Sequence, residues 1–205
     1  MAKDKKGNKK EKKKKIIRKT NVAIKKKKKK WVSLMAPKEF GGGELGESLV
    51  VDPKDLVGRN VITSLSNLNR GKNFAIKIIF RGKEIIDGNC LCEPMGYYVL
   101  NSFARRVVKK GKTKIFKSLK LKTKDNVDVV LKIVLVTRRK ITGGVSAKVR
   151  AELDSFLSET VKKADFMFTL DSIINYSFQK KIKEQMKGIY PVGSLEIVMF
   201  RKVFK

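Results

Sequence analysis

Alternating apolar and polar residues in the middle of the chain predict a series of β-strands. Residues 60–65 (NVITSL) and 73–80 (NFAIKIIF) are rich in the β-branched and aromatic side chains that favour strands. Asn69 and Gly71 lie between the two segments and Asn73 begins the second, and all three are typical of a turn. We therefore expect these segments to form neighbouring antiparallel strands.

The longest alternating segment, residues 114–140, predicts a β-hairpin. Its first half alternates apolar residues with lysines, and the chain then turns at Lys124-Asp125-Asn126 and returns through a second apolar run. The solvent side of the first half is expected to carry Lys114, Lys120 and Lys122. The returning half has apolar residues on its alternate face as well, so we expect its centre to be covered on both sides; these residues are Val130, Val134 and Val136.

Other segments place apolar residues three and four positions apart, which is the spacing of an amphipathic helix. This pattern predicts helices over residues 96–110, 146–163 and 169–187. Thr169 is the expected N-cap of the last helix, and Gly188 is expected to end it.

A final alternating segment, residues 194–204, predicts one more strand. The predicted fold class is therefore α+β, with a mainly antiparallel β-sheet or barrel, flanking helices and a basic N-terminal arm. The glycine-rich residues 40–47 lack the Gly-Lys-Ser/Thr ending of a phosphate-binding P-loop and follow no convincing strand, so we expect a flexible loop there.

The charge of the chain is strongly positive and concentrated at its start. Of its 205 residues, 50 are Lys or Arg and 19 are Asp or Glu, which gives a formal net charge of +31. Residues 1–30 alone hold 17 Lys and Arg against two acids and few large apolar side chains, so this arm should be disordered until a polyanion binds it. We place a boundary at Trp31, with a basic RNA-binding arm over 1–30 and a single α+β domain over 31–205.

Several kinds of chemistry lack the residues that they need. The chain has no histidine, and its two cysteines, Cys90 and Cys92, cannot complete a four-ligand zinc site by themselves. No Ser-His or Cys-His pair exists, and no pair of carboxylates stands out. We therefore expect neither enzyme activity nor a metal or other cofactor. No apolar segment approaches 18 residues and Ala2 excludes N-myristoylation, so no membrane partner is expected.

One set of motifs resembles a known family. The chain carries, in order and at matching spacing, Trp31, Ala36-Pro37, Phe40, Gly46-Glu47, Asp52-Pro53, Leu56 and Gly58-Arg59. This pattern is similar to the opening signature of the archaeal and eukaryotic small-subunit ribosomal protein family S-one-e, also called S-three-A-e. The similarity continues to about residue 200, through the helix with Arg105-Arg106, the hairpin end at Thr137-Arg138-Arg139 and the closing IYPVGSLEI.

The resemblance implies a structural constituent of the small ribosomal subunit that takes part in translation in the cytoplasm. Members of the family sit on the platform of the subunit, near the mRNA exit channel and the 3' end of the small-subunit rRNA. The implied partners are this rRNA, neighbouring platform proteins and mRNA near the exit channel. The alternative is a non-ribosomal RNA-binding or RNA-chaperone protein, which the charge alone would equally suit.

The predicted RNA contacts are cations, because arginine forks and lysine ammonium groups bind phosphates. The predicted contact residues are Lys25, Lys26, Lys27, Lys28, Lys29, Lys30, Arg59, Arg105, Arg106, Arg138, Arg139, Lys140 and Arg150. Arg59 has a second interpretation, as a structural partner of Glu47 or Asp52. Trp31 also has two: it stacks on an RNA base, or, as we favour, it packs on its own domain and anchors the arm.

Overall fold

The computed structural model describes residues 28–68 and 74–203, where the chain forms an α+β fold. One sheet holds the eight strands of the described residues. They are β1 (Lys30–Met35), β2 (Glu44–Val50), β3 (Asn60–Ser64), β4 (Ile76–Ile86), β5 (Asn89–Val99), β6 (Lys114–Lys122), β7 (Asp128–Thr137) and β8 (Val192–Lys202). The helices are α2 (Asn101–Val107), α3 (Gly143–Lys163), α4 (Phe166–Ile174) and α5 (Ser177–Lys187), with short 3-10 turns η1 (Lys38–Phe40), η2 (Pro53–Leu56) and η3 (Leu65–Leu68).

Strand β5 connects the two halves of the sheet. Along one edge it pairs with β4, which in turn pairs with β3. Along its other edge β5 meets β1 near Cys90 and β8 near Tyr97, so the order runs β2-β1-β5-β8-β7-β6. Gly96 stands at the meeting with β8, where a Cβ atom would overlap the carbonyl oxygen of Phe200. The sheet is open, and its pairs are antiparallel except for the short β1–β5 contact.

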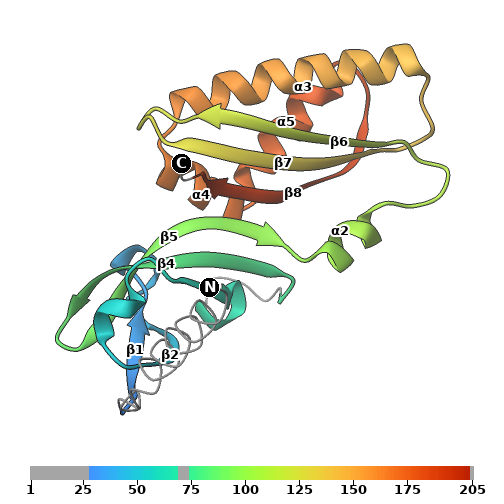
Figure 1. The fold of residues 1–205 in the computed structure, drawn as a ribbon. Coiled ribbons are helices and arrows are strands. Elements are labelled where there is room, and N and C mark those ends of the chain that lie inside the picture. The colour runs from blue at the N-terminus through green and yellow to red at the C-terminus, as the bar shows by residue number, and fades with distance from the viewer. Residues whose placement is uncertain (1–27, 69–73, 204–205) are drawn as a thin grey trace, which may run out of the picture.

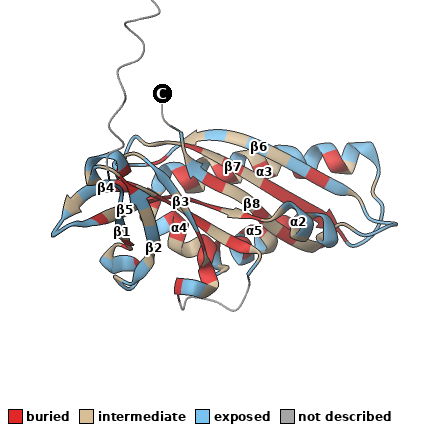
Figure 2. Cartoon of the chain, turned by 60° about the horizontal axis from the view of Figure 1, so that its bottom comes forward, coloured by how far each residue is buried: buried red, intermediate tan, exposed pale blue. Residues whose placement is uncertain are grey.

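Helices α3, α4 and α5 lie against the half of the sheet formed by β6, β7 and β8 (Figure 1). Buried Leu153 and Leu157 are four residues apart on α3, and buried Leu131 and Leu135 have the alternating spacing of a strand on β7. Figure 2 shows this burial as red segments along β7 and β8 and on part of α3. The core thus forms where the apolar face of the helices packs against the apolar face of the sheet.

The predicted hairpin is confirmed as β6 and β7, which pair over their whole length. The solvent-side lysines of β6 are exposed, and Val134 and Val136 are buried on the alternate face of β7 as expected. The antiparallel pairing of 60–65 with 73–80 is confirmed by β3 and β4, and the last strand by β8. The expected turn at 69–73 and the expected disorder of residues 1–27 concern positions outside the described residues.

The predicted helix over 96–110 is wrong in its first part. Residues 96–99 end strand β5, and only α2 is helical. Tyr97 and Val99 are buried by strand spacing, and Tyr97 pairs with Ile78 on β4 and Phe200 on β8. These tertiary contacts outweigh the local helical spacing.

The helix expected over 169–187 is two helices, α4 and α5. Tyr176 between them adopts a left-handed conformation with φ of 60°, which interrupts the helix. The side-chain amide of Gln179 donates a hydrogen bond to the carbonyl oxygen of Ile173 at 3.1 Å. This carbonyl is near the end of α4, where backbone carbonyl groups lack partners within the helix. Thr169 is not a cap; it lies inside α4 and donates to the carbonyl oxygen of Asp165 at 2.9 Å. The prediction for 146–163 is confirmed by α3.

The expected flexible loop over residues 40–47 is only partly present. Gly41 and Gly42 turn the chain with positive φ angles, but residues 44–47 belong to β2 and pair with β1. The missing signal was the pairing partner, because β1 itself begins at Lys30, the last residue of the lysine run.

Trp31 does not anchor the chain by burial. Its side chain is 67% exposed, whereas Val32 and Leu34 of the same strand are buried. Successive side chains of a strand point to opposite faces, so the burial of Val32 turns Trp31 outward. The favoured packing interpretation is therefore wrong. Trp31 instead has exposed Leu49 as its cross-strand neighbour on β2.

Candidate nucleic-acid interface

One end of the β6–β7 hairpin brings together three segments that are rich in cations. They are α2, the loop from α2 into β6, and the segment from the end of β7 into α3. The backbone N–H of Thr113 donates to the Thr137 hydroxyl at 3.1 Å, and the N–H of Ile141 donates to the Thr113 hydroxyl at 3.1 Å. These bonds join the loop between α2 and β6 to the segment between β7 and α3. We call this region the basic end and define it as Arg105, Arg106, Lys109, Lys110, Lys112, Lys114, Arg138, Arg139, Lys140, Lys148 and Arg150.

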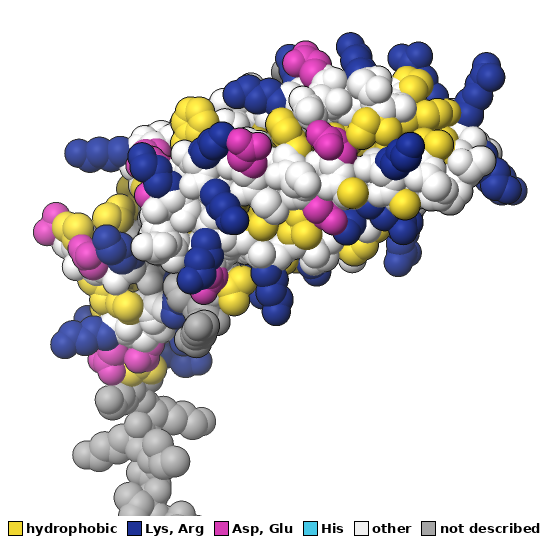
Figure 3. Space-filling model, turned by 90° about the horizontal axis from the view of Figure 1, so that it is seen from above, with side chains coloured by type: hydrophobic (Ala, Val, Ile, Leu, Met, Phe, Trp, Pro, Cys, Tyr) yellow, Lys and Arg dark blue, Asp and Glu magenta, His cyan; other side chains and the backbone are white. Residues whose placement is uncertain are grey.

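No acidic residue dilutes the charge of these segments. Residues 94–124 and 129–151 contain neither Asp nor Glu. In Figure 3 several Lys and Arg side chains project from the right-hand end of the molecule, whereas the visible acidic side chains lie toward the middle and the left, among further Lys and Arg side chains. Like charges held this close repel one another unless a polyanion neutralises them. The basic end is therefore a surface of unbalanced positive charge.

The arginines of the basic end are available to a ligand. Arg105, Arg106, Arg138, Arg139 and Arg150 are all exposed, and none takes part in the ion pairs recorded among the described residues. The Arg106 guanidinium lies 5.6 Å from the centroid of the Phe103 ring, which fixes part of its orientation. A guanidinium in this position keeps its N–H groups free to reach phosphate oxygens in pairs.

The structure separates the other predicted contact residues from the basic end. Lys28 and Lys29 precede β1 and Lys30 begins it, on the opposite part of the sheet. Arg59 lies between η2 and β3, is exposed, and belongs to none of the ion pairs recorded in the described part of the chain. Lys25, Lys26 and Lys27 lie outside the described residues. The predicted set thus does not form a single surface, since the basic end includes only Arg105, Arg106, Arg138, Arg139, Lys140 and Arg150 of it.

Sequence reasoning missed several members of this surface. Lys109, Lys110, Lys112 and Lys114 were not among the predicted contacts, and neither was the half-exposed aromatic ring of Phe116. The absence of acidic residues from 94–124 was a usable signal for the lysines. The hydrogen bonds of Thr113 that join the segments have no counterpart in the sequence pattern.

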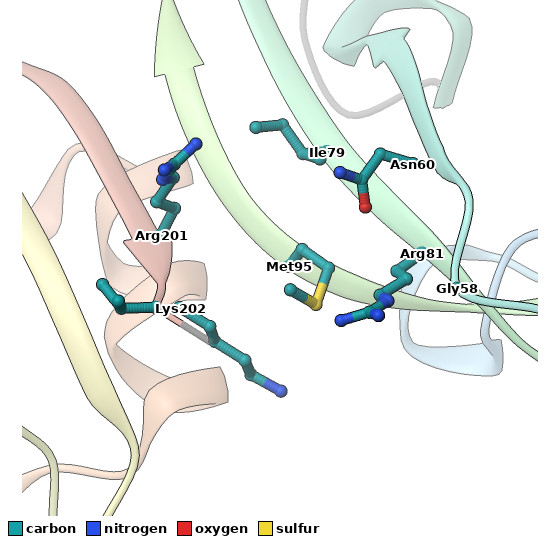
Figure 4. Close-up of a pocket in the computed structure, with 8 residues that line it drawn as sticks. Gly58, Asn60, Ile79, Arg81, Met95, Arg201 and Lys202 are labelled. Carbon is teal, nitrogen blue, oxygen red and sulfur yellow. The ribbon is translucent and has the colours of Figure 1, made fainter. Parts of the chain in front are cut away.

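A second group of cations lines a pocket between β4 and the end of β8 (Figure 4). Arg81 points into it from β4, and Arg201 and Lys202 approach from β8. Lys202 forms an ion pair with Glu93, the residue that lies opposite Arg81 on β5. Because an acid offsets part of the charge here, this pocket is a weaker candidate than the basic end.

The two cysteines are unsuited to metal binding. Cys90 and Cys92 are buried and free, and burial raises the pKa of Cys92 to about 12. A metal ligand needs the thiolate, whereas this environment favours the protonated thiol. Within residues 28–68 and 74–203 no three His, Cys, Asp or Glu side chains gather into a metal-binding group. Among the same residues, no helix is long and apolar enough to cross a membrane.

The protein thus combines an α+β fold with a surface of concentrated positive charge, as is common among proteins that bind polyanions. The sequence pattern of the Ribosomal S3Ae family matches residues 17–204, and the chain belongs to this family. It is therefore a ribosomal protein, with a structural rather than an enzymatic role.

Curated relatives cover most of the chain. The small ribosomal subunit protein eS1 of Picrophilus torridus is 30% identical over 168 residues, which are 82% of this chain and 80% of the relative. The protein of the same name from Methanobrevibacter smithii is 26% identical over 170 residues, or 82% of this chain and 88% of the relative. A third, from Haloarcula marismortui, is 24% identical over 169 residues, or 82% and 79%. The similarity thus spans most of the relatives as well as most of the chain.

Proposed function

We propose that this ribosomal protein is a structural component of the small ribosomal subunit and serves translation by holding rRNA in shape. The observation that carries the proposal is the basic end, an exposed and acid-free surface in a member of a ribosomal protein family. Ribosomal RNA presents dense phosphates, and each phosphate that a cation neutralises releases counterions and so favours binding. The partner of this surface is accordingly small-subunit rRNA.

The predicted arginines have distinct places in this binding. Arg138, Arg139 and Lys140 leave the end of β7, where the hydrogen bonds of Thr113 and Thr137 hold the backbone. Arg105 and Arg106 come from α2, and Arg150 comes from the exposed side of α3. Because the cations come from α2, from α3 and from the end of β7, they can contact phosphates on separate turns of an RNA helix or on separate strands.

The N-terminal lysines form a second contact with RNA. Residues 1–30 act as an arm that binds RNA through Lys25–Lys30, while the domain of residues 31–205 supplies the fold. The start of β1 at Lys30 supports this division. The match to the family from residue 17 onward indicates that part of the arm is common to members as well.

On the subunit, the protein occupies the platform beside other platform proteins, close to the mRNA exit channel and the 3' end of the rRNA. The names of the relatives support the small subunit, and the resemblance of the opening motifs supports the platform. mRNA leaving the channel is then a further partner, and the protein acts in cytoplasmic ribosomes.

Co-sedimentation tests the proposal against the alternative of an RNA-binding protein outside the ribosome. The full chain, expressed with an epitope tag, is expected to travel with small subunits in a sucrose gradient. It should remain there after a salt wash that strips loosely bound basic proteins, because a built-in protein has many simultaneous contacts. Recovery of the chain mainly free or on mRNA after a moderate wash would refute the proposal.

A further inference from the structure

The half-exposed ring of Phe116 lies beside the cations of the basic end. Its side chain is 49% exposed, and together with Arg105, Lys114 and Asn101 it lines a shallow hollow between β6 and α2. The ammonium group of Lys114 lies 5.9 Å from the centroid of its ring. The exposed half of this ring contributes nothing to folding and is available to a ligand.

Strand geometry explains why the ring is outside the core. The neighbouring Lys117 forms an ion pair with Asp154 of α3, with 2.5 Å between Nζ and Oδ2. Side chains alternate along a strand, so Phe116 points to the face of the sheet away from α3. The floor of the hollow on that face is apolar, since it includes the buried Val134 of β7 and the partly buried Val198 of β8.

We propose that this hollow binds one unpaired RNA base, which stacks on Phe116 while Arg105 and Lys114 hold the adjoining phosphates. The proposal rests on the proposed function and adds the form of RNA that the basic end selects. A flat apolar ring accepts the face of any base, and the cations on its rim match the phosphates on either side of it.

The ligand is an unpaired base because a base inside an RNA duplex is stacked on both faces. Proteins reach base faces chiefly in loops, bulges and ends, where the bases are splayed out. The rest of the basic end can bind the phosphates of either form, so only the Phe116 hollow distinguishes a loop from a duplex. Asn101 adds an amide at the rim that can donate to or accept from the edge of the base.

Charge favours RNA over an acidic protein as the occupant. All the residues that line the hollow except Val198 of β8 belong to the acid-free segments 94–124 and 129–151, and the cations of the basic end extend well beyond it. A protein partner would have to present acidic side chains over this whole surface, whereas phosphates repeat along any RNA. An acidic peptide remains a distinguishable outcome of the test.

The experiment compares two RNAs of equal length at one salt concentration, namely a hairpin with an unpaired loop and a fully paired duplex. Full-length chain with Phe116→Leu is expected to bind the hairpin about ten-fold more weakly and the duplex unchanged. Phe116→Tyr, which keeps the ring, should bind both like the unaltered chain. Arg105→Gln should weaken binding to both RNAs. The exposure of Phe116 makes these variants compatible with folding, and circular dichroism checks this.

The outcomes distinguish a failure of the proposed function from a failure of the base-stacking proposal. An unaltered chain that binds neither RNA contradicts the proposed function itself. An unaltered chain that binds both, with Phe116→Leu retaining full affinity for the hairpin, overturns the base-stacking proposal alone. Displacement of the hairpin by poly-glutamate with equal ease from the unaltered chain and from Phe116→Leu also overturns it, since the ring would then add nothing to binding beyond charge.

Discussion

Thr137, the last residue of β7, is hydrogen-bonded through both its backbone and its side chain to Thr113, which lies in the loop between α2 and β6. The backbone N–H of Thr137 donates to the Thr113 carbonyl oxygen at 3.0 Å, and the Thr137 hydroxyl accepts from the Thr113 N–H at 3.1 Å. The same hydroxyl donates to the carbonyl oxygen of Arg139 at 2.6 Å. One buried side chain therefore fixes the two segments that carry most cations of the basic end.

Replacing Thr137 by valine should destabilise the fold without changing its charge. Valine has the shape of threonine but leaves the Thr113 N–H and the Arg139 carbonyl without their side-chain partner, at a cost of about 1–3 kcal/mol. Urea denaturation should show a lower transition midpoint with an unchanged slope. Thr142→Val is the matched control, because the Thr142 side chain is exposed and makes no capping bond. Equal loss of stability in both variants would contradict the role assigned to Thr137.

The double variant Arg138→Gln, Arg139→Gln should bind structured RNA more weakly and with a shallower dependence on salt. Loss of two phosphate contacts lowers the slope of log affinity against log salt by about 2. Lys162→Gln, Lys163→Gln is the matched control, because it removes the same charge at the far end of α3. Filter binding over a series of salt concentrations measures both slopes. If the two double variants gave the same slope, the basic end would not be the RNA-binding surface.

Helices and strands can be predicted from the sequence more reliably where apolar residues recur at a regular spacing over a few neighbouring positions. The hairpin of β6 and β7 could be predicted because each strand alternates within a few residues. Strand β5 could not, since Tyr97 and Val99 suit both a helix and a strand until Phe200 is placed beside them. Around Trp31 the pattern gives only a weak indication of which face of β1 meets the core, because Ser33 is the one polar residue among the apolar residues 31–36.

The candidate site likewise contains residues that the local sequence indicates and residues that only the tertiary fold brings together. Arg138 and Arg139 stood out as a basic pair at the end of a predicted strand. The place of Phe116 beside Arg105 depends on the path of the chain through α2 and on the bonds of Thr113, which are contacts between distant positions. Local sequence reports the kinds of residue present, and the tertiary fold decides which of them share a surface.

Trp31 and Val32 provide a direct test of the orientation of β1. Trp31→Ala should change the free energy of unfolding by less than about 0.5 kcal/mol, as expected for an exposed side chain away from special features. Val32→Ala should cost about 1–3 kcal/mol, because Val32 is buried in the core. The fluorescence of the only tryptophan should also be readily quenched by acrylamide in the native state. A larger loss of stability for Trp31→Ala than for Val32→Ala would refute the orientation.

Removal of residues 1–27 should leave the domain folded and weaken its binding to RNA. These residues hold 14 Lys and Arg against two acids, and β1 begins only at Lys30. The shortened chain should therefore keep its thermal transition but show a flatter dependence of RNA affinity on salt. A chain shortened by a further eight residues, so that it begins at Ala36, is the contrasting variant, since it loses the buried side chains of β1 and should unfold. An unchanged salt slope after removal of 1–27 would contradict the assignment of an RNA-binding arm.

Glu196 on β8 should make the stability of the domain depend on pH. One oxygen of its carboxyl group, Oε2, is buried without a hydrogen-bond partner among the described residues, and burial raises the pKa of this group. Tyr97 and Tyr176 are the titratable neighbours, and burial raises the pKa of both hydroxyls as well. The folded state therefore binds the Glu196 proton more tightly than the unfolded chain does. This stabilisation is fully present below the unfolded pKa of about 4.3 and is lost as pH rises through the folded pKa.

At neutral pH the ionised Glu196 consequently opposes folding, and Glu196→Gln should raise the stability of the domain by up to about 1 kcal/mol. The difference between the variant and the unaltered chain should shrink as pH falls toward about 4, where the carboxyl group becomes protonated in both states. Urea denaturation at several pH values measures this difference. Glu184→Gln, an exposed substitution on α5, provides the matched control for the removed charge. A gain for Glu196→Gln that stays constant between neutral and acidic pH would show that the buried carboxylate is not its source.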